Sequence, residues 1–168
     1  SKASGLLAMA TGNYSTADGT RTLASKNNCH AEGDTTKATA TSAHSEGNET
    51  VASGNVSHAE GWKTKATGIA SHSEGEGTIA AGRGQTAMGR YNVSDTSSKL
   101  LVGIGTSDTA RKNGFKVSST GQGYFASDVY ANDSKKLATE EFVTTSIGNK
   151  QDKITDTLIL ADTITGAR

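Results

Sequence analysis

The sequence contains no proline, a single cysteine and few aromatic residues, which make up 5% of the chain. Because a compact monomer fills its core with large side chains, a chain with only 33% hydrophobic residues is poorly suited to form one. Cys29 has no second cysteine with which to pair, so an internal disulfide is excluded.

The sequence also lacks a net charge and a long apolar run. Its 17 basic and 17 acidic residues balance, which argues against a nucleic acid or an anionic membrane as the partner. No stretch is long and apolar enough to span a bilayer, and none has the pattern of a signal peptide. Low hydrophobicity can indicate disorder, but disordered chains usually combine it with a high net charge and no strict period. This sequence has a strict period instead.

The period is fourteen residues. The chain has four histidines, spaced fourteen apart, and each is followed two residues later by a glutamate and then by a glycine. The same frame extends in both directions, so seven turns cover residues 1–98 without an insertion. A fixed period of this kind indicates a repetitive structure. The fifth position of every turn is glycine: Gly5, Gly19, Gly33, Gly47, Gly61, Gly75 and Gly89.

Small residues alternate within each turn, at positions one, three and five and again at eight, ten and often twelve. This alternation predicts two short strands per turn with small side chains pointing inward. Stacked about 4.8 Å apart, seven turns would form a rod about 34 Å tall. Bends are expected at the position-five glycines and at position twelve, where glycine adopts conformations that other residues avoid; the position-twelve glycines are Gly12, Gly54, Gly68 and Gly82. Cys29 takes the first position of its turn, where other turns have Ser, Ala or Gln, so a buried filler is favoured over a reactive thiol.

Two segments connect this repeat to a known family. Residues 57–61 are Ser-His-Ala-Glu-Gly and residues 66–68 are Ala-Thr-Gly. Together with the period and the glycines, they resemble the Ser-x-Ala-x-Gly and Ala-x-Gly units of the YadA-like head repeat of trimeric autotransporter adhesins, over residues 1 to about 94. The resemblance implies an all-β solenoid, a left-handed parallel β-roll with 14-residue coils, and a homotrimer of three rolls around one axis. In that family, valine and isoleucine typically flank the central alanine and pack toward the axis, whereas this chain has histidine and glutamate there.

Positions two and four of the first strand point away from the small-residue core, and in turns three to six they carry the histidines and glutamates. We predict a polar ladder along the trimer axis, because buried carboxylates need partners and imidazoles are the only regular candidates. The ladder residues are His30, Glu32, His44, Glu46, His58, Glu60, His72 and Glu74. Two alternatives stay open, an axial metal ion or anion bound by the four histidines and a solvated outer face. Because a His-x-Glu pair is not a specific metal signature, neither a metal nor a cofactor is predicted.

The composition changes after the seventh turn. Strands are expected at residues 99–105 and 114–117, with a polar turn at 106–113 and a further short strand or two within 121–130. These residues form a small β element, 99–131, and within it residues 100–125 resemble one common in phage tail fibres and related receptor-binding proteins. Residues 132–168 are expected to contain a short helix at 139–148, a linker at 149–153, a strand at 157–165 and the start of a C-terminal module. The segment 136–143 also resembles one that recurs in phage tail proteins.

The sequence offers no catalytic set, and the Gly-Ile-Gly at 103–105 lacks the third glycine and the strand–helix context of a dinucleotide site. We therefore expect a structural and adhesive fibre protein that is not an enzyme, namely a receptor-binding segment of a phage or prophage tail fibre in the virion tail. The alternative is the head of a trimeric autotransporter-type adhesin on the bacterial cell surface. A third class is a carbohydrate-cleaving tailspike.

The expected partners are two further copies of the chain and a host cell-surface receptor or glycan, with no nucleic acid and no membrane insertion. Three copies of a weak surface site would add by avidity. Aromatic and cationic loop residues suit such contacts, and the candidates are Trp62, Lys65, Arg90 and Tyr91.

Overall fold

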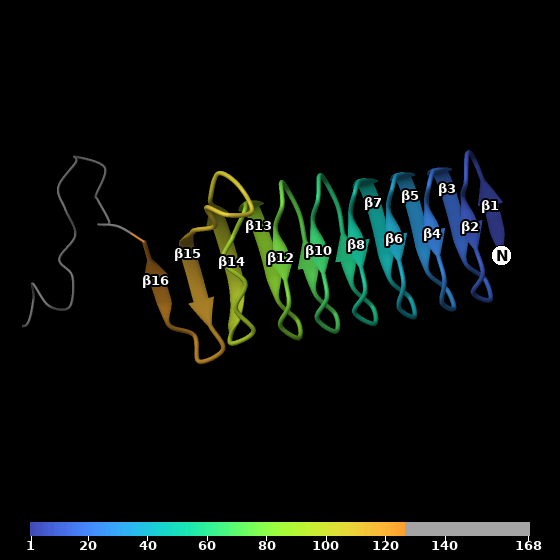
Figure 1. Ribbon diagram of the computed structural model, residues 1–168. Coiled ribbons are helices and arrows are strands. Elements are labelled where there is room, and N and C mark those ends of the chain that lie inside the picture. The colour runs from blue at the N-terminus through green and yellow to red at the C-terminus, as the bar shows by residue number, and fades with distance from the viewer. Residues whose placement is uncertain (127–168) are drawn as a thin grey trace, which may run out of the picture. The chain divides into compact units, whose positions relative to one another are not determined.

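The computed structural model describes residues 1–126, which form one continuous β-solenoid (Figure 1). Each of the first six coils contributes one strand to each of two parallel sheets, as the alternation predicts, and the seventh contributes a strand to the first sheet alone. Partner residues in neighbouring coils are fourteen apart, for example His30 with His44, so the predicted stacking register is confirmed. The helix predicted at 139–148, the linker at 149–153 and the strand at 157–165 lie outside the described residues.

The coils build two sheets of different strand length. The first sheet contains β1 (Lys2–Ser4), β3 (Thr16–Thr20), β5 (His30–Asp34), β7 (His44–Asn48), β9 (His58–Ala59), β11 (His72–Ser73) and β13 (Thr86–Arg90). The second sheet contains β2 (Met9–Ala10), β4 (Leu23–Ala24), β6 (Lys37–Ala38), β8 (Val51–Ala52), β10 (Lys65–Ala66) and β12 (Ile79–Ala80).

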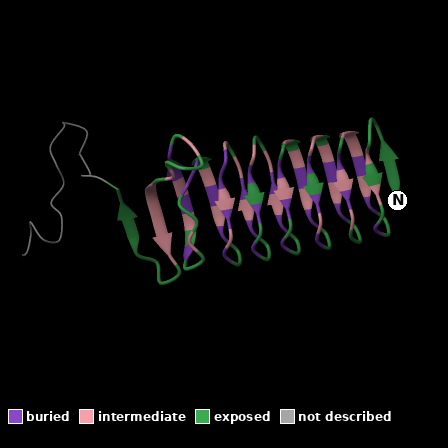
Figure 2. Ribbon diagram, in the orientation of Figure 1, coloured by how far each residue is buried: buried purple, intermediate pink, exposed green. Residues whose placement is uncertain are grey.

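Small side chains fill the core between the sheets. The buried positions recur from coil to coil along the rod (Figure 2). The alanines at positions three and ten are fully buried from the second coil on, as Ala31 and Ala38 illustrate. The sheets approach so closely that Ser45 Oγ lies 2.8 Å from Thr50 Oγ1. Among residues 1–126, Leu101 is the largest fully buried side chain. Since burial contributes roughly 25 cal/mol per Å² of apolar surface, such a core gives one rod little hydrophobic stabilisation per residue.

Cys29 replaces a serine of the repeat without changing the contact. The Ser15 hydroxyl donates to the Gly12 carbonyl at 2.6 Å, and the Cys29 thiol donates to the Lys26 carbonyl at 2.8 Å. Cys29 is only 1% exposed, so the prediction of a buried filler is confirmed.

Position five requires glycine for two reasons, which Gly47 illustrates. Its φ of 101° lies in the left-handed region, and a Cβ atom there would lie 2.2 Å from the Gly61 carbonyl oxygen. Position twelve also lies in a bend, as predicted, and a Cβ atom at Gly54 would lie 2.0 Å from the Gly68 carbonyl oxygen. None of the position-twelve glycines, however, has a φ in the left-handed region. The bends place positions seven and fourteen there instead, for example Glu49 at 55° and Val56 at 59°.

The first sheet continues past the seventh coil. β14 (Ser98–Ile104) pairs in parallel with β13, again with partners fourteen residues apart, such as Thr86 with Leu100. β15 (Asn113–Ser118) and β16 (Gly123–Phe125) follow in antiparallel pairing. The strands predicted at 99–105 and 114–117 are therefore confirmed, and the domain boundary predicted at residue 98 lies within a continuous sheet.

The second sheet ends at β12, where a side-chain amide replaces the next strand. In the preceding coils, the N–H of position nine donates to the position-eight carbonyl of the next coil, as Lys65 does to Thr78 at 2.8 Å. The Ile79 N–H instead donates to Asn92 Oδ1 at 2.7 Å, and Asn92 Nδ2 donates to the Ile79 carbonyl at 3.0 Å. Asn92 thus pairs with Ile79 as a backbone peptide would.

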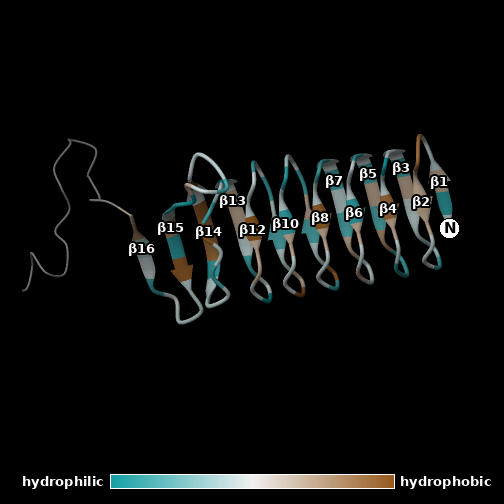
Figure 3. Cartoon of the chain, in the orientation of Figure 1, coloured by the Kyte–Doolittle hydropathy of each residue, from teal (hydrophilic) through white to brown (hydrophobic). Residues whose placement is uncertain are grey.

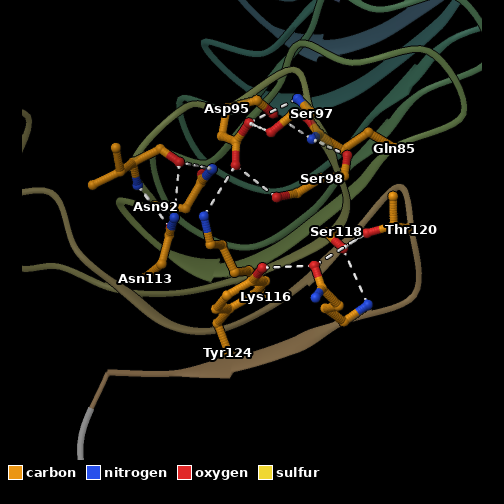
Figure 4. Close-up of polar contacts among 12 residues, drawn as sticks. Gln85, Asn92, Asp95, Ser97, Ser98, Asn113, Lys116, Ser118, Thr120 and Tyr124 are labelled. Carbon is orange, nitrogen blue, oxygen red and sulfur yellow. Dashed lines mark hydrogen bonds and ion pairs between the residues drawn. The ribbon is translucent and has the colours of Figure 1, made fainter.

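Gln85 closes the same edge with its own amide (Figure 4). Its Oε1 accepts hydrogen bonds from Ala81 N at 2.8 Å and Gly82 N at 3.0 Å. Its Nε2 donates to the carbonyls of Asp95 at 2.5 Å and Ser98 at 2.7 Å. Because an open strand edge can pair with another chain, these two buried amides terminate the second sheet while the first continues.

Asp95 fixes the segment that crosses this closed edge (Figure 4). Its carboxylate accepts hydrogen bonds from the Ser97 hydroxyl at 2.6 Å, the Ser98 hydroxyl at 2.6 Å and the Ser97 N–H at 2.7 Å. Lys116 Nζ lies 3.4 Å away. The two hydroxyl bonds hold the pKa of Asp95 well below its usual range, so the carboxylate is charged at neutral pH.

Candidate interaction face

The outward face of the first sheet carries the histidines and glutamates of the predicted ladder. Those that form ion-pair contacts have side chains 32–44% exposed in the single chain, so they are neither core residues nor fully solvated. Consecutive imidazoles contact one another along the rod. The His44 ring is stacked between its neighbours, with its centroid 4.9 Å from that of His30 and 4.7 Å from that of His58. His72 meets His58 edge-on at 4.9 Å.

The imidazoles contact carboxylates of their own and the preceding coil. His72 Nε2 lies 3.3 Å from Glu60 Oε1 and 3.7 Å from Glu74 Oε2, and His58 Nε2 lies 3.4 Å from Glu46 Oε1. These distances permit ion pairs but exceed those of good hydrogen bonds. Accordingly, three buried imidazole nitrogens lack a hydrogen-bond partner, the Nε2 atoms of His30, His44 and His58.

Burial and like charges change the proton affinities on this face. Burial lowers the pKa of His44 and His58, and the neighbouring imidazoles lower it further. The pKa of Glu46 is raised, first by its hydrogen bond with Glu32 and then by burial. The neutral form of His44 and His58 is therefore favoured at pH 7, and a neutral imidazole keeps a nitrogen lone pair free to bind a cation.

An open groove of about 570 Å³ runs along the same face. Four carboxylates and four glycines line it: Asp18, Glu32, Glu46, Glu60, Gly19, Gly33, Gly47 and Gly61. Because glycine has no side chain, backbone is uncovered beside a row of acidic groups. The groove is thus an acidic surface with a repeat of one coil.

The chemistry of the face changes toward β16 (Figure 3). Leu100 and Val102 of β14 continue positions two and four, and β15 places Val117 opposite Leu100 and Phe115 opposite Val102. Phe125 then packs on Phe115 with ring centroids 4.8 Å apart and remains 59% exposed. We call Met88, Leu100, Val102, Phe115, Val117 and Phe125 the apolar strip.

The apolar strip was not predicted from the sequence, although the sequence contains the pattern that indicates it. Leu100 and Val102 lie fourteen residues after Thr86 and Met88, and Gly103 then occupies position five. The repeat therefore extends into an eighth coil whose flanking residues are aliphatic.

Two of the predicted surface contacts are accessible but lie in different parts of the coil. Trp62 is 43% exposed at a bend after β9, and Lys63 Nζ lies 4.8 Å from its ring centroid. Lys65 is exposed on the second sheet, where position nine alternates between aliphatic and cationic residues from β4 to β12 (Figure 3). The structure does not bring these two predicted contacts into one site.

The other two predicted contacts are engaged within the chain. Arg90 Nε donates to Glu76 Oε2 at 2.7 Å, although its side chain remains 56% exposed. Tyr91 is only 7% exposed and lies beneath Arg111, whose guanidinium carbon is 5.6 Å from the ring centroid. Tyr91 therefore offers little surface to a partner.

The function of this chain is inferred from its fold and from this face. No protein-family model matches the chain, and no curated protein matches it. Within residues 1–126 there is no helix with the length and apolar character needed to cross a bilayer.

Proposed function

We propose that this chain is a rod-forming segment of a homotrimeric fibre, in which the first-sheet faces of three copies meet around one axis. The observation that carries this proposal is the face itself, which combines partly buried imidazoles and carboxylates with the apolar strip. In the apolar strip Phe125 is exposed and the other five residues are half-buried, and a contiguous apolar patch that a single chain leaves partly uncovered is typical of an interaction site. Association would also compensate for the small side chains of the core.

Among trimeric fibres, we favour a receptor-binding segment of a phage or prophage tail fibre. The support is the resemblance of residues 100–125 and 136–143 to segments of phage tail proteins. The 14-residue roll by itself would suit a trimeric autotransporter-type adhesin equally well. Both assignments imply an extracellular location, on the virion tail or on the bacterial cell surface.

The oligomeric state is the first test. The mass of the full chain in native buffer, measured at micromolar concentration by light scattering, should be three times the chain mass of 17.2 kDa. Replacing Leu100 and Val102 together by serine should weaken the trimer, because it removes aliphatic side chains from the proposed interface. Replacing the exposed Ile69 by serine, at a bend remote from this face, is the control. A monomeric wild-type protein would refute the proposal.

Receptor binding is tested separately on intact host cells and their purified surface glycan. Trp62→Ala should weaken binding, because an exposed aromatic ring is a common contact for sugars. Ile69→Ala, which removes a similarly exposed side chain from the opposite bend, should not. We propose no enzymatic activity, so the glycan should keep its chain length; its shortening would favour a carbohydrate-cleaving tailspike.

A further inference from the structure

We infer that each chain binds two divalent transition-metal ions of the zinc class, one between Glu32, His44 and Glu46 and one between Glu60, His72 and Glu74. In each group, one donor atom from every residue lies within 4.8 Å of the other two. This inference goes beyond the proposed fibre function and does not depend on it, because all ligands come from one chain.

In the group of Glu60, His72 and Glu74, the spacing of the donors fits a metal better than it fits direct contacts. His72 Nε2 lies 3.3 Å from Glu60 Oε1 and 3.7 Å from Glu74 Oε2. Hydrogen bonds between nitrogen and oxygen are shorter, usually 2.7–3.2 Å. In a tetrahedral zinc site with bonds of about 2.0–2.2 Å, neighbouring ligand atoms lie about 3.3–3.6 Å apart. A central ion would therefore need only small side-chain movements.

The imidazole nitrogens provide a second, independent observation. His44 Nε2, in the first of the two proposed sites, is buried but makes no hydrogen bond, and the same holds for His58 Nε2 in the group between the two sites. A buried polar atom without a partner is unfavourable by about 1–3 kcal/mol, so such atoms are uncommon unless something binds them. A metal ion would satisfy the nitrogen and neutralise the adjacent carboxylates at the same time.

The type of donors selects the type of ion. One imidazole and two carboxylates suit zinc and its neighbours, whereas magnesium and calcium prefer a full set of oxygen ligands. A fourth position would remain for water, which a half-exposed face allows.

Shared ligands set the stoichiometry at two ions. A third group, Glu46, His58 and Glu60, has the same spacing but uses one glutamate from each of the other two groups. The four ladder glutamates carry a charge of −4, which two divalent ions balance and three would exceed. We therefore expect the middle group to stay empty while both outer groups are filled.

The test measures zinc bound to the full chain at equilibrium, by dialysis against micromolar zinc chloride followed by elemental analysis. The wild-type chain should bind two ions. His44→Asn and His72→Asn should each leave one, whereas His30→Asn and His58→Asn, the matched controls on the same ladder, should leave two. The double variant of His44 and His72 should still bind one ion through the middle group, and adding His58→Asn should abolish binding.

Several outcomes would overturn the inference. They are no zinc bound by the wild type, equal losses from His58→Asn and His72→Asn, or one ion for every three chains, which would mean an ion shared on the axis. The visible spectrum of the wild type with cobalt(II) gives a measurement that needs no variant, and an octahedral rather than a tetrahedral spectrum would also count against the sites. The native mass, recorded on the same samples, separates failure of these sites from failure of the trimer.

Discussion

At position eight, a substitution that restores the residue typical of the repeat should lower the stability of this protein. It is threonine in coils two to six and asparagine in coil seven, so restoring the repeat would mean Asn92→Thr. We expect this change to destabilise the last coil. The Asn92 amide accepts a hydrogen bond from Ile79 N and donates one to the Ile79 carbonyl. A threonine hydroxyl is too short to form both bonds in this paired geometry.

The magnitude follows from the two backbone groups left without partners. Each unpaired buried group costs about 1–3 kcal/mol. Because water can reach part of the opened edge, we expect a loss of about 2–4 kcal/mol for Asn92→Ala and about 1–3 kcal/mol for Asn92→Thr. At 1.4 kcal/mol per factor of ten, the alanine variant should open this edge roughly 30- to 1,000-fold more often.

Native-state hydrogen exchange is the appropriate assay, since loss at one end of a solenoid remains local. In the alanine variant, the amide of Ile79 should exchange faster by the stated factor. The amide of Lys65, on the neighbouring strand β10, should change little. Thr64→Ala is the matched control, because Thr64 holds the same position and its hydroxyl has no hydrogen-bond partner. If Asn92→Thr left Ile79 fully protected, or if Thr64→Ala exposed its neighbours as strongly, the amide argument would be refuted.

Two further predictions concern backbone geometry and pH. Gly47→Ala should lower the free energy of unfolding by about 3 kcal/mol or more, measured by urea unfolding, because it combines a disfavoured φ with a Cβ clash. Gly84→Ala is the control and should cost only about 1 kcal/mol. Ala70 already has a left-handed φ similar to that of Gly84, and no atom lies within 4 Å of a Cβ placed at Gly84. In metal-free buffer, the melting temperature should fall as pH decreases through the ordinary histidine pKa of 6.5, because the folded-state pKa values of His44 and His58 are lowered and the unfolded chain binds more protons. The His44→Asn and His58→Asn double variant should have a flatter profile, and an unchanged slope would contradict the assignment.

The sequence allowed the stacked part of the fold to be predicted, because every coil must match its neighbours. A residue at position three meets position three of the next coil, so alanine or serine recurs there, as at Ala31 and Ser45. The left-handed residue of the second bend could not be predicted in this way. Position fourteen points a side chain toward solvent, and residues as different as Tyr14 and Val56 occupy it. Since no contact restricts the residue type, no pattern marks the conformation.

The closed edge and the apolar strip were missed for a different reason, since both are departures from the repeat. Gln85 and Asn92 replace small residues at the edge of β12, where a strand of the next coil would otherwise supply carbonyl groups. β14, in contrast, keeps the fourteen-residue offset while histidine and glutamate give way to Leu100 and Val102. The backbone geometry of the face is thus constant, while its side chains change from imidazoles and carboxylates to apolar groups. It follows that the ladder and the apolar strip can be altered separately, so a variant that loses zinc but keeps its mass would assign the two properties to different parts of one continuous sheet.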